Sequence, residues 1–191
     1  MTIHHSLIRD KAAEYRLGYF LDPDRNVIFS AERPDLVNGE HLNKALASIE
    51  LKLRRMGASV RAIQAVKDII IELACNTLMH GAGDQSRPEL LVVSHYDGHI
   101  GVWLFGQGRR SQIQRLHRII KAIDSMAKPP KHRDILFERR NRDLLRTNSS
   151  PASKSYGSGA GMLTIAALSS MPIRFASSTS DDKSFMLLST I

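Results

Sequence analysis

The stretch 59–80 constrains the fold of this chain more than any other segment. Its apolar residues recur at spacings of three and four, as on one face of an amphipathic α-helix, and Gly81 follows as a stop signal. Glu72, Asn76 and His80 are spaced by four and form a polar ridge beside the apolar stripe. We therefore expect a long helix on the core, with this ridge at the core's edge, where a pocket wall would lie.

The rest of the chain alternates between helix-like and strand-like segments. Apolar spacing predicts a helix over 40–56, and turn residues at 22–26 and 97–98 predict two hairpins, over 17–30 and 89–105. Further predicted elements are helices over 112–126, 135–145 and 160–170 and closing strands over 173–177 and 184–191. This order indicates an α+β fold, a two-layer sandwich with helices on one face of a mostly antiparallel mixed sheet.

Length and cysteine content narrow the class of protein. The chain has 191 residues, and we expect a single domain over 1–191. A single cysteine, Cys75, excludes an internal disulfide framework and favours the cytoplasm. Because Cys75 falls in an apolar helical run, we expect a buried hydrophobe and not a nucleophile. The first ten residues lack a secretory signal and are expected to be frayed, and no apolar run approaches the ~20 residues of a membrane span.

The positive charge is concentrated in one segment. The chain carries a formal net charge of +8, yet the segment 109–154 alone has thirteen Lys or Arg against four Asp or Glu. A local basic patch suits an acidic partner, such as a triphosphate, an acidic protein surface or RNA. The alternative is a solvated surface without a partner. The wider segment, about 107–156, is long and irregular, as functional lids and insertions are.

Two groups of residues have the chemistry of a nucleotide site. Mg²⁺ prefers oxygen ligands and keeps several waters, so the amide of Asn76 and substrate phosphates could hold it, while Glu72 one turn away could accept a proton. The alternative is an ordinary surface stripe. A glycine-rich cluster opens the helix predicted after it and offers bare backbone amides to an anion; it comprises Gly157, Ser158, Gly159, Ala160, Gly161 and Met162. Its alternative is a flexible linker before a capped helix. A further pair, Gly106 and Gly108, follows a strand, where a simple turn is the alternative.

In combination these segments resemble the GHKL nucleotide-binding superfamily. Residues 72–81 resemble its asparagine box, 157–162 its second glycine box, and Ser184 takes the place of the hydroxyl residue in its final strand. More closely than the superfamily as a whole, the compact layout resembles the small SiaB-type bacterial protein kinases. The resemblance implies ATP and Mg²⁺ as cofactors, with Glu72 as the catalytic base and Asn76 as the magnesium ligand. The residues that it assigns to ATP binding are Asn76, His80, Gly106, Gly108, Gly157, Ser158, Gly159, Ala160, Gly161, Met162 and Ser184.

One position departs from the family pattern. The first glycine box normally has an Asp two residues before its first glycine, where it reads the adenine amino group. In this chain that position is Leu104, before Gly106. A leucine cannot accept that hydrogen bond, which puts adenine selectivity in doubt.

The resemblance implies a Mg-ATP-dependent serine/threonine protein kinase that phosphorylates a small regulatory partner in a bacterial partner-switching pathway. The basic segment would neutralise the triphosphate or dock an acidic surface of that partner. One alternative is a non-catalytic GHKL-fold module that sequesters a partner, which Leu104 favours. Another is a basic nucleic-acid-binding protein, against which Phe137 is the only aromatic residue from 109 to 154. We expect no membrane partner, and the resemblance slightly favours a homodimer over a monomer.

Overall fold

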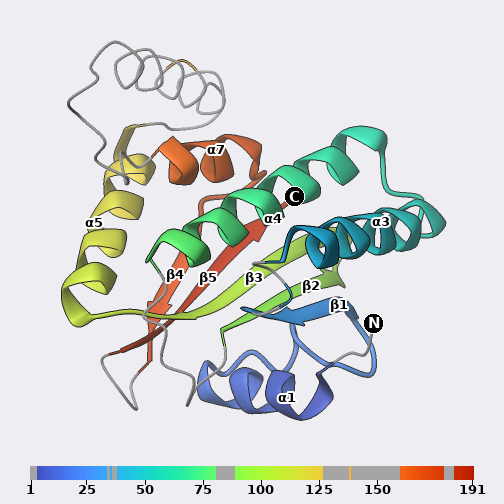
Figure 1. Cartoon of the computed structure of the whole chain (residues 1–191), viewed down its shortest axis with the longest axis horizontal. Coiled ribbons are helices and arrows are strands. Elements are labelled where there is room, and N and C mark those ends of the chain that lie inside the picture. The colour runs from blue at the N-terminus through green and yellow to red at the C-terminus, as the bar shows by residue number, and fades with distance from the viewer. Residues whose placement is uncertain are drawn as a thin grey trace.

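Five helices and five strands make up the part of the chain that the computed structural model describes, which comprises residues 4–33, 35, 38–80, 89–126, 138, 160–178 and 183–191. The helices are α1 (His5–Glu14), α3 (Gly39–Arg55), α4 (Val60–His80), α5 (Arg110–Met126) and α7 (Ala160–Leu168). The strands are β1 (Val27–Glu32), β2 (Leu90–Tyr96), β3 (His99–Gln107), β4 (Arg174–Ser177) and β5 (Ser184–Thr190) (Figure 1). The predicted α+β class is confirmed, and the helix predicted over 135–145 lies outside the described residues apart from Glu138.

The strands form one sheet in the order β1-β2-β3-β5-β4, and every neighbouring pair is antiparallel. The last strand, β5, therefore lies between β3 and β4, and Leu104 of β3 pairs with Leu187 of β5. The β2–β3 hairpin turns at Asp97 and Gly98, which have φ values of 47° and 77°. Positive φ at both central residues is the geometry of a tight hairpin turn, so this predicted hairpin is confirmed.

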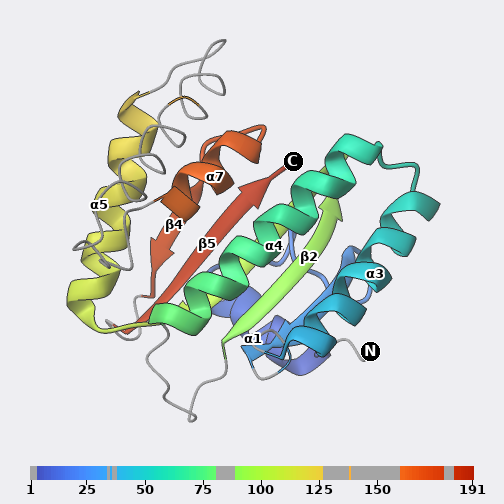
Figure 2. The same cartoon turned by 45° about the horizontal axis from the view of Figure 1, so that its top comes forward.

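One face of the sheet is covered by α3, α4, α5 and α7 (Figures 1 and 2). The observed bounds of α3 and α4 agree closely with the predicted helices, although Gly81, the predicted stop signal after α4, lies outside the described residues. Asn38 caps α3 by accepting hydrogen bonds from two backbone amides, and Gly57 follows the end of α3 with a φ of 78°. Core residues contributed by these helices and the sheet include Ile49, Leu53, Ile69, Ile70, Leu73, Leu91, Val102, Leu104, Ile120, Ile165 and Leu187. No helix that the structure describes is long and apolar enough to cross a membrane.

The other face carries α1, which corrects the prediction of a frayed N-terminus. Ile8 and Ala12 of α1 are buried with Leu21 against the β2, β3 and β5 side chains that point away from α4. Few of the α1 side chains are apolar, so its periodicity is weak in the sequence. The predicted hairpin over 17–30 is wrong: residues 17–21 form turns, and β1 pairs with β2 instead.

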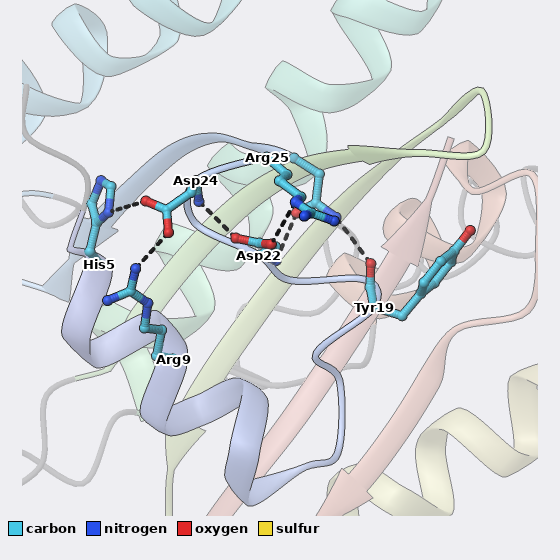
Figure 3. A network of polar contacts seen from close by, with 7 residues as sticks. His5, Arg9, Tyr19, Asp22, Asp24 and Arg25 are labelled. Carbon is cyan, nitrogen blue, oxygen red and sulfur yellow. Dashed lines mark hydrogen bonds and ion pairs between the residues drawn. The ribbon is translucent and has the colours of Figure 1, made fainter.

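A polar network fastens α1 to the turn before β1 (Figure 3). Asp24 accepts a hydrogen bond from Nη2 of Arg9 at 2.5 Å and lies 3.1 Å from Nδ1 of His5. Within the turn, Asp22 accepts a hydrogen bond from the backbone nitrogen of Asp24 at 2.9 Å. The turn predicted at 22–26 is therefore real, although it joins the 17–21 turns to β1 and not two strands.

Candidate functional site

The polar ridge of α4 lies at the border of the core, as its spacing predicts. Ile69, Ile70 and Leu73 are buried against the sheet, whereas Glu72 and Asn76 are half-buried and lie one turn apart. The helix ends at His80, whose side chain is outside the described part of the structure. A role for His80 in binding nucleotide therefore stays a prediction.

The start of α7 meets this ridge at Gly161. A Cβ atom built on Gly161 would lie 2.8 Å from Oε2 of Glu72, 3.3 Å from Nδ2 of Asn76 and 3.6 Å from its Oδ1. Any side chain at this position would push against both polar groups, so glycine allows the close approach of the two helices. The structure thus brings together residues from two predicted motifs that are far apart in the sequence. Gly157, Ser158 and Gly159 of the same cluster lie outside the described residues.

The C-terminal end of α7 is anchored to β5. The Ser169 hydroxyl donates to the backbone oxygen of Ile165 at 2.7 Å and shares a hydrogen bond with the Ser189 hydroxyl, also at 2.7 Å. The backbone nitrogen of Ser170 donates to the backbone oxygen of Thr190 at 2.7 Å. With its far end held in this way, α7 presents its first turn to α4. The first turn of α7, where the positive end of the helix dipole lies, is therefore beside the Glu72 carboxylate.

The amide of Asn76 has an unused donor. Its Nδ2 atom is buried, and no residue within the described structure accepts a hydrogen bond from it. Leaving such a donor unpaired costs about 1–3 kcal/mol. A phosphate oxygen that reached Nδ2 would accept this hydrogen bond, and the Asn76 Oδ1 oxygen would remain for Mg²⁺. Because Gly161 lies against both atoms, the start of α7 would have to move away from Asn76 for the phosphate to enter. The residues at this point therefore fit a magnesium-bound phosphate.

A protein-only metal cage is not seen among the described residues, where no group of three or more His, Cys, Asp or Glu side chains could hold a metal ion. The predicted magnesium site relies instead on Asn76, with phosphate oxygens and water as the other ligands.

The first glycine pair has a different environment from the one expected. Gly106 lies inside β3 and not in a turn after it, and a Cβ atom at this position would lie 2.5 Å from Cζ of Phe185. Phe185 continues a row of aromatic rings through Phe175 to His117 of α5, with ring centroids 5.8 and 5.3 Å apart. Glycine at 106 thus makes room for a ring of the protein itself.

Leu104 and Gly108 complete this region. Leu104 is buried in the core on the face covered by α4 and α7. Gly108 is also buried, and its backbone nitrogen donates to the backbone oxygen of Lys183 at 2.9 Å. Neither residue presents a hydrogen-bonding side chain, so position 104 supplies no acceptor where the GHKL pattern would have an aspartate.

Two further predicted site residues take other places. Ser184 shares the α1-facing side of β5 with Met186 and Leu188, because side chains alternate along a strand. The structure therefore places Ser184 on the opposite face of the sheet from Glu72 and Asn76, against its predicted position in the pocket. Met162 is buried in the core beneath α7, so only its backbone could meet a phosphate. For Ala160 the structure describes the backbone alone, at the start of α7.

Sequence reasoning missed Glu89 and misjudged Cys75. Glu89 immediately precedes β2 and is buried, although nothing but its place before an apolar strand sets it apart in the sequence. Cys75 is exposed and not buried, because α4 turns positions 71 and 75 away from the sheet.

A cavity of about 580 Å³ lies on the face of the sheet that carries α1. Its lining includes Phe20, Tyr96, Trp103, Arg174, Met186 and Leu188. None of the predicted site residues that the structure describes lines it, and its lining includes no residue of α4 or α7 from the described part of the chain.

Comparisons with known proteins support the fold. No protein-family model matches the chain, and no curated protein matches it in sequence. A chain from the crystal structure of the SiaB-SiaC complex from Pseudomonas aeruginosa is similar over the full length of both chains, with a TM-score of 0.68 and 17% sequence identity. At this identity the likeness shows a shared fold.

Proposed function

We propose that this protein is a Mg-ATP-dependent serine/threonine protein kinase of the GHKL type. The observation that carries the proposal is the contact of Gly161 with Glu72 and Asn76, which makes one polar site from two distant motifs. In this site Asn76 holds the metal and a phosphate oxygen, and the first turn of α7 donates backbone hydrogen bonds to phosphate. Glu72 accepts the proton of the attacking hydroxyl group.

The substrate that we propose is a small regulatory protein in a partner-switching pathway. The chain with the similar fold was crystallised in a complex of SiaB with SiaC, which supports a protein partner. Exposed basic side chains of α5, among them Arg118 and Lys121, lie on the same side of the sheet as α4 and α7 and suit an acidic partner surface. The homodimer and the cytoplasmic location expected from the sequence stay predictions.

A second candidate function keeps the fold without the chemistry. In this alternative the protein sequesters a regulatory partner and transfers no phosphate. Leu104 and the Phe185 ring beside Gly106 favour it, because neither offers a hydrogen bond to a base. Nucleotide-dependent phosphate transfer to a partner would exclude this alternative.

Calorimetric titration with a non-hydrolysable ATP analogue, with and without Mg²⁺, tests the proposal. We expect magnesium-dependent binding that is lost in Asn76→Ala. The matched control is Gln64→Ala, which removes an exposed amide from the same ridge of α4 about 18 Å away and should bind as the wild type does. Absence of binding at millimolar nucleotide by the folded wild type would leave the sequestering function as the better one. An unchanged magnesium dependence in Asn76→Ala would move the metal site elsewhere.

A further inference from the structure

The Glu89 carboxylate has few hydrogen-bond partners for a group buried so deeply. Its side chain is 7% exposed. Its Oε1 accepts one long hydrogen bond, 3.5 Å from the backbone nitrogen of Gln107. Its Oε2 accepts none, and the cation paired with it, Nε of Arg33, lies 3.8 Å away. One carboxylate oxygen is thus left without a donor in the described structure.

This arrangement is unfavourable as a purely structural feature. Burial raises the pKa of the Glu89 carboxyl above its usual range, although Arg33 and the Gln107 backbone act in the opposite direction. A buried carboxylate without donors destabilises a fold, and an apolar residue of similar size would serve packing better. A donor from a bound molecule would satisfy the free oxygen.

Glu89 lies on the side of the sheet that carries the candidate site. Leu91 belongs to the core beneath α4, so Glu89, two residues earlier, points to the same face. Leu90 pairs with Phe105, which places Glu89 beside Gly106 on the neighbouring strand. Figures 1 and 2 show that α4 ends at the same end of the sheet at which β2 begins. One row across the sheet, at the end of the sheet where α4 ends, therefore contains Glu89, Gly106 and Phe185.

The same row adjoins the position at which the family aspartate is missing. Leu104 pairs with Leu91, so Leu104 and Leu91 form the next row of side chains on this face. The carboxylate of Glu89 is displaced from Leu104 by one row along the sheet and by one strand across it. It is the buried acceptor that this end of the site has in place of an aspartate at 104.

We propose that Glu89 accepts a hydrogen bond from an N–H group on the edge of a purine base and so selects the nucleotide of this site. The inference rests on the proposed function, because it concerns the base of the same nucleotide. In ATP the donor is the adenine amino group. Guanine also presents N–H donors at its edge, and a separate titration distinguishes the two bases.

The test is a set of calorimetric titrations with Mg²⁺ and non-hydrolysable triphosphates of three bases: adenine, guanine and unsubstituted purine, which lacks the amino group. The wild type should bind the adenine analogue roughly 10- to 100-fold more tightly than the purine analogue, as for a hydrogen bond to a charged group. Glu89→Leu should reduce this ratio to within about threefold, and Glu89→Gln should retain part of it because an amide oxygen also accepts. A preference for the guanine analogue that Glu89→Leu abolishes would support the same role with guanine as the base.

Thermal unfolding without nucleotide separates base recognition from a structural role. If Glu89 is held ready for a ligand, Glu89→Gln should unfold at the same temperature as the wild type or higher. Glu32→Gln is the matched control: Glu32 pairs with Leu90 at the same end of the sheet and faces the opposite side. This control should leave the base preference unchanged.

Four outcomes would overturn the inference. Equal wild-type affinity for the adenine and purine analogues, or a preference that survives in Glu89→Leu, would remove Glu89 from base recognition. Magnesium-dependent binding through Asn76 would still stand in either case, so the proposed function would survive. A clear loss of stability in Glu89→Gln would assign the carboxylate to an ion pair with Arg33. If the folded wild type bound none of the analogues, both this inference and the proposed function would fail.

Discussion

The two ends of the candidate site use glycine for opposite purposes. At the end formed by α4 and α7, Gly161 lets two polar side chains approach a helix backbone. At the end formed by β3 and β5, Gly106 lets the Phe185 ring lie on the sheet. The first approach leaves the Asn76 amide with a donor that has no partner in the described structure, and the second fills space with an aromatic ring. A glycine in a nucleotide-binding pattern therefore indicates close approach, and the approaching group decides whether a ligand can share the space.

The largest expected effect concerns the polar end. Glu72→Gln should lower phosphate transfer by about 10²- to 10⁴-fold, the usual contribution of a general base, and spare nucleotide affinity because the amide has the same size. Transfer of labelled γ-phosphate to the partner protein measures the rate, and calorimetry measures the affinity. Asp68→Asn, which removes a carboxylate one turn earlier on the same ridge, is the control and should transfer normally. Transfer at the wild-type rate by Glu72→Gln would assign the base to another residue.

A matched pair of glycine variants compares the two ends directly. Gly106→Ala should destabilise the protein by about 1–3 kcal/mol, because its methyl group meets a packed aromatic ring in the sheet. Gly161→Ala meets the end of the flexible Glu72 side chain, and alanine adds up to ~1 kcal/mol of helix propensity in α7. Its stability should therefore change little, while phosphate transfer falls because the carboxylate is displaced. Urea unfolding of both variants provides the comparison, and an equal loss of stability in the two would refute the contrast between the ends.

The smallest expected effect concerns α1, which lies outside both ends of the candidate site. It serves as a reference for the effects at those ends. The hydrogen bond from Arg9 is the main cause that holds the pKa of Asp24 below its ordinary value of 3.8, and His5 adds to it. A carboxyl group whose pKa is lower in the folded state than in the unfolded state stabilises the fold at pH values above its unfolded-state pKa. This contribution is lost as the pH falls through the folded-state pKa. Arg9→Ala should therefore unfold at a slightly lower temperature than the wild type at pH 7. This difference should shrink as the pH falls below the ordinary carboxyl pKa of 3.8, and it should vanish only below the lowered folded-state pKa of Asp24. A difference that did not shrink on acidification would contradict this account, and nucleotide binding should be unaffected.

Several features were predictable because their signals lie within contiguous residues. The apolar spacing of α4 places Glu72 and Asn76 on one ridge before any tertiary contact is known. Asp97 and Gly98 specify the hairpin between β2 and β3 through their backbone conformation alone. The predicted positions of α7 and β5 agree with the structure for the same reason.

The features that were missed depend on contacts between distant residues. With only Ile8 and Ala12 buried, α1 has little helical periodicity, and its place on the sheet depends on the apolar face that β2, β3 and β5 present to it. Cys75 is exposed because α4 packs on the sheet through a different side of the helix. Glu89 becomes conspicuous only when its burial and its missing partner are known.

Apolar periodicity and turn residues are local properties of the sequence. From them most of the helices and strands and the polar ridge of this protein can be predicted. Which side chains share a site depends on strand register and helix packing. Register places Phe185 over Gly106 and puts Ser184 on the far face, and the packing of α7 on α4 brings Gly161 to Glu72. Because side chains alternate along a strand, a register shift of one residue would exchange the two faces of β5, and no local pattern in the sequence reports that choice.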